Sequence, residues 1–142
     1  MEAAHLAARA GVPLAYVKPH GALYHRANAD DAVARAVVGG AVDALGYELF
    51  VLGFHHGGAL ARACSEAGVA YLREAFADRG TDARGALLPR DAPGALRTSP
   101  RECAETALAY ARTGEVDTLC VHGDTTGAEA IARAVRAALD AR

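Results

Sequence analysis

The sequence has no tryptophan and only three phenylalanines among its 142 residues, so its core depends on aliphatic side chains and alanine. It has no long apolar run, because arginine, histidine, aspartate or glycine interrupts each one, and this excludes a transmembrane helix. The net charge of −2, without a basic cluster, argues against a nucleic-acid surface. Residues 1–5 contain no basic segment followed by an apolar core, so we expect no secretory signal.

Cysteine is scarce as well, with three scattered copies. An odd number of cysteines without a C-x-x-C motif predicts reduced thiols and a cytoplasmic protein. The motifs G-x-x-x-x-G-K-[ST] and G-x-G-x-x-G are missing, so nucleotide binding by such loops is not supported. The serine motif G-x-S-x-G is missing too, which argues against hydrolysis through a covalent serine intermediate.

What the sequence does contain is an alternation of short apolar runs and longer helical patterns. Apolar runs predict strands at 14–17, 48–52, 69–72 and 117–121, and helical spacing predicts helices at 2–10, 30–45, 57–67, 99–113 and from 125. Between them, residues 77–98 form one long irregular segment, and loops of that length are usually functional or disordered. The alternation predicts a single α/β domain with parallel strands covered by helices.

Local signals indicate where several helices begin. Asp30 or Asp31 can cap the second helix. Ser99, followed by proline and by glutamate at the capping-box position, can open the fourth. We expect Thr125 or Thr126 to cap the last helix.

Charged side chains and histidines gather just after the predicted strands. They are Lys18 and His20, His55 and His56, Glu74, Asp78, Arg79 and Arg90, and His122 and Asp124. In parallel sheets and barrels, sites are built at the carboxyl ends of the strands. The placement therefore predicts a functional site at that edge.

The first two clusters also have plain structural interpretations. Lys18 and His20, two residues apart, face the same side of an extended segment and suit one substrate. Alternatively, His20 can bond the backbone in a turn, and Lys18 can be the solvated end of a strand. His55 and His56 are adjacent, so only one can point inward, and a metal ion would need further ligands from elsewhere.

The sharpest cluster is His122–Thr125. Gly123 permits close approach of the backbone, and free N–H groups at the start of the next helix favour an anion such as a carboxylate or phosphate. Asp124 can instead be the cap of that helix. Likewise, Asp78–Arg79 can be a plain surface ion pair.

Four sequence blocks together resemble the LamB/YcsF family. They are V-K-P-H-G-A-L-Y at 17–24, F-A-D-R at 76–79, L-L-P-R with P-G-A at 87–95, and T-L-C-V-H-G-D-T at 118–125. The sequence departs from the family's pattern at His25, Gly80–Thr81 and Thr126, and it lacks the acidic D-x-N-x-D-x-G-E block with which members of the family begin.

The resemblance implies a (β/α)7-type TIM-like barrel, similar to those of glycoside hydrolases and deacetylases, with residues 1–142 as its C-terminal portion. We expect one partial barrel domain, the product of a truncated or split gene. Half a barrel leaves strand edges and one sheet face open, so we expect the chain to associate with a second copy or with a separate N-terminal half.

The resemblance also implies a function, that of the A subunit of 5-oxoprolinase. This activity is the ATP-dependent hydrolysis of 5-oxo-L-proline to L-glutamate, with ATP and magnesium as cofactors and subunits B and C as partners. It implies catalytic roles for Lys18, His20, His122 and Asp124, and substrate or phosphate binding by Asp78, Arg79, Arg90, Gly123 and Thr125.

Within that site, cations would neutralise a phosphorylated intermediate, and Lys18, Arg79 and Arg90 supply them. His20 or His122 would carry protons, and Asp124 would orient one of them or hold a metal. Two other functions stay open on the sequence: a metal-dependent sugar or amide hydrolase of the deacetylase-like barrel type, and a non-catalytic binding or assembly module.

Overall fold

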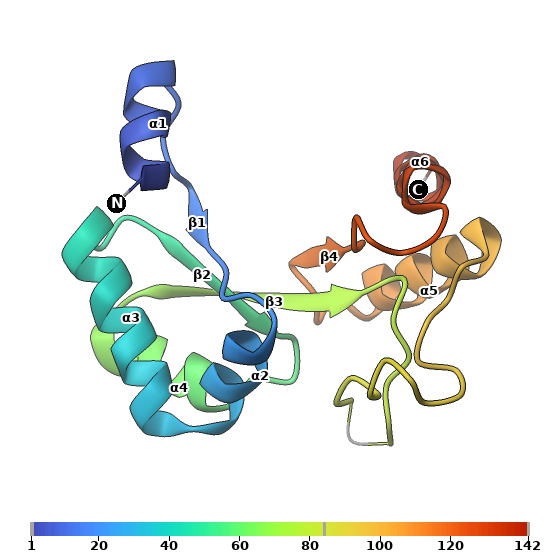
Figure 1. Cartoon of the computed structure of the whole chain (residues 1–142), viewed down its shortest axis with the longest axis horizontal. Coiled ribbons are helices and arrows are strands. Elements are labelled where there is room, and N and C mark those ends of the chain that lie inside the picture. Colours follow the sequence, from blue (N-terminus) through green and yellow to red (C-terminus); the bar gives the residue numbers. More distant parts are fainter. Residues whose placement is uncertain (1, 84, 142) are drawn as a thin grey trace. The chain divides into compact units, whose positions relative to one another are not determined.

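A computed structural model describes residues 2–83 and 85–141 of the chain, and the side chains from residue 5 onward within these ranges. The chain divides into two compact units, a first unit of residues 1–73 and a second unit of residues 74–142. Both combine helices with parallel strands (Figure 1), which confirms the predicted α/β class.

The first unit contains most of the helices. In chain order it holds α1 (Glu2–Ala10), β1 (Tyr16–Val17), α2 (Ala22–Ala29), α3 (Asp31–Leu45), β2 (Phe50–Phe54), α4 (Ala59–Ala67) and the start of β3 (Ala70–Phe76). β1 and β2 pair in parallel, with Tyr16 opposite Phe50 and Val17 opposite Val51. Figure 1 shows α2, α3 and α4 lying next to one another in this unit.

Small aliphatic side chains build the core of the first unit. Val38, Val51 and Leu60 are its largest fully buried aliphatic residues, and alanines of α2, α3 and α4 fill the space between them. The helices pack closely because so many of the residues that face one another are alanines. The scarcity of aromatic residues in the sequence is thus matched by a core of tightly packed small side chains.

The carboxyl end of β2 is built around an asparagine. Asn28, which is buried, donates from Nδ2 to the carbonyl of Tyr24 at 2.8 Å and accepts the N–H of Phe54 on Oδ1 at 3.2 Å. Tyr71 donates its hydroxyl to the carbonyl of Phe54 at 2.8 Å. A Cβ on Gly53 would collide with both side chains. The strand predicted at 48–52 therefore ends too early: Gly53 lies inside β2, where it makes room for both side chains.

The second unit repeats the strand–helix pattern once. It holds the end of β3, α5 (Pro100–Thr113), β4 (Thr118–Cys120) and α6 (Ala128–Asp140). β3 and β4 pair in parallel through three consecutive residue pairs. Cys103, Ala107 and Ile131 are completely buried where α5 and α6 pack together.

The predicted irregular segment at 77–98 is folded back on itself. Antiparallel bridges join Arg79 to Leu96 and Thr81 to Leu87. Gly80 donates its N–H to the carbonyl of Ala95 at 2.9 Å, and its own carbonyl accepts the N–H of Leu88 at 3.0 Å. A Cβ on Gly80 would collide with the backbone of Gly94, so only glycine permits this close approach. We call residues 77–98 the folded loop.

Predicted helix starts are confirmed at α3 and α5 but not at α6. Asp30 accepts the N–H groups of Ala32 and Val33, and Ser99 accepts that of Glu102. The expectation that Thr125 or Thr126 caps the last helix is wrong, because the cap is Gly127, in the left-handed conformation and without a side-chain bond. Thr125 is drawn away because its hydroxyl bonds a carboxylate in the interior.

The remaining differences from the expected elements concern boundaries. The pattern missed α2 as a separate helix, and Asp30 both ends α2 and starts α3. Glu74, expected after the third strand, lies within β3 and is buried. β1 and β4 are shorter than the apolar runs that predicted them. All three cysteines are free thiols, as expected, and burial raises the pKa of Cys64 to about 11.

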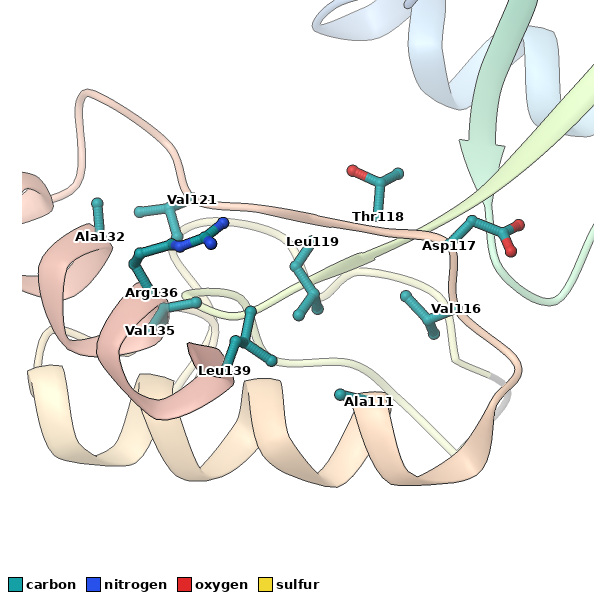
Figure 2. A pocket seen from close by; sticks show the side chains of 10 residues that line it. All are labelled: Ala111, Val116, Asp117, Thr118, Leu119, Val121, Ala132, Val135, Arg136 and Leu139. Atoms are coloured by element: carbon teal, nitrogen blue, oxygen red, sulfur yellow. The ribbon is translucent and has the colours of Figure 1, made fainter. Parts of the chain in front are cut away.

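A pocket opens in the second unit between β4, α5 and α6. Its volume is about 570 Å³, and Figure 2 shows Leu119, Val135 and Leu139 among the apolar side chains that point into it. None of the predicted site residues lines this pocket. Among the described residues, no helix combines the length and the apolar character that crossing a bilayer requires.

Two glycines of the first unit provide a matched test of the packing. Gly58 has φ 131°, and a Cβ there would lie 2.5 Å from the carbonyl oxygen of Asn28, whereas Gly40 lies in α3 with open space around it. We expect Gly58→Ala to destabilise the chain by at least about 1–3 kcal/mol through its backbone conformation alone. Gly40→Ala should stabilise α3 by about 1 kcal/mol. Urea unfolding of both variants measures the difference, and equal effects would contradict this account.

Candidate functional site

The parallel register of the second unit brings two predicted site residues together. Glu74 lies opposite Thr118, Ala75 opposite Leu119, and Phe76 opposite Cys120. The N–H of Ala77 then donates to the carbonyl of Cys120 at 3.0 Å. Two residues beyond the last pair of these strands lie Asp78 and His122, so their side chains emerge side by side at the carboxyl ends of β3 and β4.

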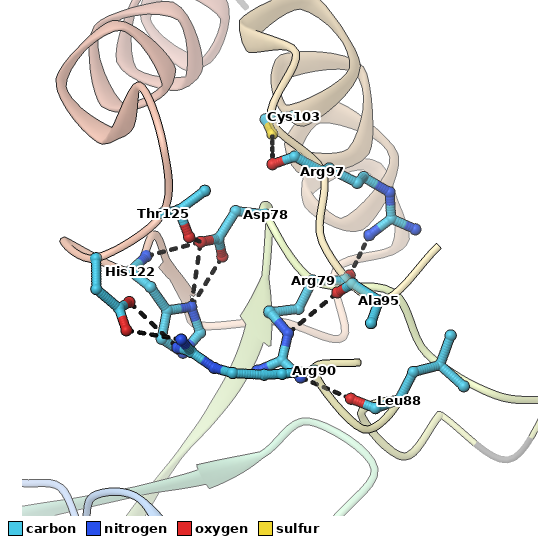
Figure 3. Close-up of polar contacts among 10 residues, drawn as sticks. Asp78, Arg79, Leu88, Arg90, Ala95, Arg97, Cys103, His122 and Thr125 are labelled. Carbon is cyan, nitrogen blue, oxygen red and sulfur yellow. Dashed lines mark hydrogen bonds and ion pairs between the residues drawn. The ribbon is translucent and has the colours of Figure 1, made fainter. Parts of the chain in front are cut away.

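Asp78 is the buried centre of this edge (Figure 3). Its side chain is 0% exposed, and Oδ2 accepts the Thr125 hydroxyl at 2.6 Å and the backbone N–H of His122 at 3.0 Å. Burial acts to raise the pKa of the carboxyl, but the hydrogen bonds from His122 and Thr125 outweigh it and hold that pKa below its ordinary value. Asp78 is therefore an ionised carboxylate, and the expectation that Asp78 and Arg79 form a surface ion pair is wrong.

This carboxylate sets the tautomer of His122. Oδ1 of Asp78 lies 3.0 Å from Nδ1 of the imidazole, and an ionised carboxylate only accepts, so Nδ1 carries the proton. In a neutral imidazole with the proton on Nδ1, the lone pair is on Nε2. The ring stacks on Phe76 at 5.5 Å between centroids, which fixes its plane, and the side chain stays 24% exposed. Such a histidine is arranged to accept a proton from an external group.

Arg79 is a buried cation that holds the folded loop together. Only 6% exposed, it donates from Nε to the carbonyl of Ala95 at 3.1 Å and from Nη2 to that of Leu88 at 2.6 Å. Its own carbonyl accepts from Arg97. Burial, followed by the charge of Arg90, lowers the pKa of the guanidinium. Figure 3 shows Arg79 and Arg90 in the same region of the folded loop.

Arg90 and Asp124 form a two-pronged ion pair between the folded loop and the turn after β4. Nη1 and Nη2 of Arg90 reach Oδ2 and Oδ1 of Asp124 at 2.6 and 3.1 Å. The hydrogen bond with Arg90 lowers the pKa of Asp124 and raises that of Arg90. Asp124, expected to orient a histidine or hold a metal, thus contacts Arg90, while Asp78 contacts His122.

Gly123 and Thr125, predicted to bind substrate or phosphate, lie in the same turn. The carbonyl of His122 accepts the N–H of Thr125 at 3.2 Å, which closes the turn. Both residues line an open hollow at the start of α6. The hydroxyl of Thr125 is directed to Asp78, so it supports the dyad of Asp78 and His122 and leaves Gly123 as the exposed residue.

The predicted residues Lys18 and His20 lie in the first unit, after β1. Lys18 is half-buried, with its ammonium 5.7 Å from the centre of the Tyr24 ring, and His20 is exposed. After β2, His56 stacks on Phe54 at 5.1 Å between centroids. The half-buried His55 packs against the His56 ring in a T-shaped arrangement. His55 and His56 thus differ in burial, as their adjacency predicts.

Two contributors to the site were not predicted from the sequence. Phe76 has a detectable signal, because it lies two residues before Asp78 and therefore faces the same side of the strand. Arg97 has none, because its role depends on the carbonyl of Arg79, which only folding brings within its reach. Among the described residues, no group of three or more histidine, cysteine, aspartate or glutamate side chains is arranged to hold a metal ion.

Comparison with known proteins agrees with the sequence blocks around these residues. The profile of the LamB/YcsF family matches residues 2–142. The chain belongs to the LamB/YcsF family. This confirms the resemblance drawn from the sequence and covers every residue of the site described above.

Curated members of the family share substantial identity with the chain. A protein of Streptomyces coelicolor, named as the A subunit of 5-oxoprolinase, is 46% identical, over 92% of this chain and 56% of its own length. One of Chloroflexus aggregans with the same name is 44% identical, over 97% of this chain and 59% of its own. The chain therefore spans a little more than half the length of the curated relatives it matches.

A solved structure of the family shows the same fold. The crystal structure of a lactam utilization protein from Thermus thermophilus superposes with a TM-score of 0.85 at 35% identity. The match covers 97% of this chain and 59% of that one.

The buried charge of Asp78 predicts that the free energy of unfolding depends on pH. Because its pKa is lowered on folding, ionisation of Asp78 stabilises the fold above the ordinary carboxyl pKa of 3.8, and this stabilisation is lost as the pH falls through the lowered value. We expect Asp78→Asn to be less stable than the parent chain at pH 7 and the gap to narrow toward pH 3. Urea unfolding at several pH values measures it.

The matched control is Asp43→Asn, at an exposed position of α3. Its difference from the parent chain should stay small and nearly constant over the same range. A gap for Asp78→Asn that does not change between pH 7 and pH 3 would contradict the assignment of a buried, ionised carboxylate.

Proposed function

We propose that the chain acts in the hydrolysis of 5-oxo-L-proline to L-glutamate, as part of the A subunit of 5-oxoprolinase. The observation that carries the proposal is the Asp78–His122 pair, whose geometry is that of an oriented proton acceptor. Membership of the family supports it, as do relatives named for the A subunit of this enzyme and a structural neighbour named for lactam utilization.

The chemistry of a lactam requires such a residue. Its amide is stabilised by resonance, so water needs a base at the moment it attacks the ring carbonyl. Nε2 of His122 accepts the water proton, and Asp78 stabilises the imidazolium that forms. Thr125 and the backbone N–H of His122 hold Asp78 in place, so the ring does not have to reorient during the reaction.

Coupling to ATP belongs to the proposal as well. When bound with magnesium, ATP supplies a phosphoryl group that activates the stable amide. Arg79 and Arg90 supply the positive charge for an anionic group, and the charge of Arg90 lies close enough to lower the pKa of the Arg79 guanidinium. Lys18 and His20 keep the roles of cation and proton carrier that the resemblance implies.

Association with other chains is also part of the proposed function. Since the chain spans 56–59% of its curated relatives, we propose that it corresponds to the C-terminal part of a (β/α)7-type barrel. Those relatives are named as one subunit of an enzyme, which supports association with subunits B and C. The three free cysteines agree with a reducing compartment such as the cytoplasm.

The test is a reconstituted assay. The chain, subunits B and C, ATP with magnesium and 5-oxoproline are combined, and glutamate and ADP are measured. We expect His122→Gln to lower the turnover rate by a factor of about 100 or more, because a general base is lost. The same substitution is made at the corresponding position of the full-length Streptomyces coelicolor relative.

His5→Gln is the control, because His5 is exposed on α1. It should leave the turnover rate unchanged. A folded His122→Gln variant of the relative that keeps its turnover rate would contradict the proposal. Retained association with subunits B and C, without turnover in either the parent chain or the relative, would identify a binding or assembly module instead.

A further inference from the structure

The Arg90–Asp124 ion pair differs in its place from the other arginine–carboxylate pairs of the described surface. Arg101–Glu105 joins two positions one turn apart on the same helix, and Arg62–Asp31 joins α4 to α3. The Arg90–Asp124 pair instead joins the folded loop to the turn after β4, two residues beyond His122. It therefore lies at the strand ends where the candidate base is exposed.

This pair is poorly suited to stabilising the fold. The two side chains are 49% and 64% exposed, and an ion pair in water gains little over its separately hydrated partners. The folded loop is already held by the buried Arg79 and its two backbone carbonyls. The turn is already held by Thr125. Opening the pair therefore costs little free energy, and the folded loop and the turn stay in position when it opens.

The geometry of the pair indicates the kind of group that Arg90 is suited to hold. Two parallel N–H···O contacts to the two oxygens of Asp124 are the arrangement by which a guanidinium recognises a planar carboxylate. The nearby positive charge of Arg79 adds to the attraction for an anion. Asp78, the other carboxylate of the site, already has its oxygens bonded to His122 and Thr125.

We propose that Arg90 is the receptor for the carboxylate of a ligand, and that Asp124 occupies its place until the ligand arrives. Binding exchanges one carboxylate for another, so Arg90 keeps its two contacts while Asp124 turns to water. With the proposed function, on which this inference rests, the ligand group is the carboxylate of 5-oxoproline. Asp124 is then a residue that sets affinity and specificity by competing for Arg90.

The experiment measures binding to the full chain alone, without ATP or other subunits. Acetate, inorganic phosphate, 5-oxoproline and 2-pyrrolidinone, which is the same lactam without the carboxylate, are titrated, and the arginine Nε–H signals are followed by NMR. We expect Asp124→Asn to tighten acetate and 5-oxoproline binding by about threefold or more, because the competing state is removed. Arg90→Gln should weaken both by about tenfold or more.

The controls separate this effect from general changes in charge. Arg101→Gln removes a guanidinium from another exposed ion pair and should leave every dissociation constant unchanged. Binding of 2-pyrrolidinone should be the same in all variants. Asparagine is well tolerated in turns, so Asp124→Asn is expected to fold.

Three outcomes would overturn the inference. They are no tightening by Asp124→Asn, equal effects of Arg90→Gln and Arg101→Gln, or tightening that is confined to phosphate. Acetate that follows the expected pattern while 5-oxoproline binds to no variant would uphold the carboxylate receptor and count against the proposed substrate.

Discussion

A single buried carboxylate, that of Asp78, organises the second unit. An ionised group with no exposure to water is tolerated only if its oxygens are bonded to donors. Asp78 takes those donors from the turn after β4, namely the side chain and backbone of His122 and the hydroxyl of Thr125. The need to solvate one charge therefore joins the end of β3 to the end of β4 and sets the direction in which the candidate base points.

The folded loop follows the same physical rule with the opposite charge. Arg79 is only 6% exposed, and backbone carbonyls of Leu88 and Ala95 serve as its acceptors. These hydrogen bonds fix the conformation of the otherwise irregular folded loop. The exposed Arg90 lies in the folded loop, and the exposed Asp124 lies in the turn that Asp78 holds. Because both segments are fixed, a weak contact in water can still have a defined geometry.

Local features of the fold could be predicted from the sequence, because they depend on a few adjacent residues. Asp30 and Ser99 start helices by bonding N–H groups two or three positions away, and the alternation of runs identified parallel strands. The ends of the strands are harder to predict from the sequence. Gly53 lies within β2 and leaves room for the side chains of Asn28 and Tyr71, which come from other parts of the chain. Thr125 fails to cap α6 because a buried acceptor competes for its hydroxyl.

For the site, short blocks of adjacent residues are enough to identify the family, the residue types and their place after the strands. The fold determines which of these residues pair. Asp78 and His122 are 44 residues apart, and only the register of β3 with β4 makes them neighbours. It also decided that Asp124 faces Arg90, since two carboxylates of equal chemistry are distinguished only by burial and by the donors within reach of each.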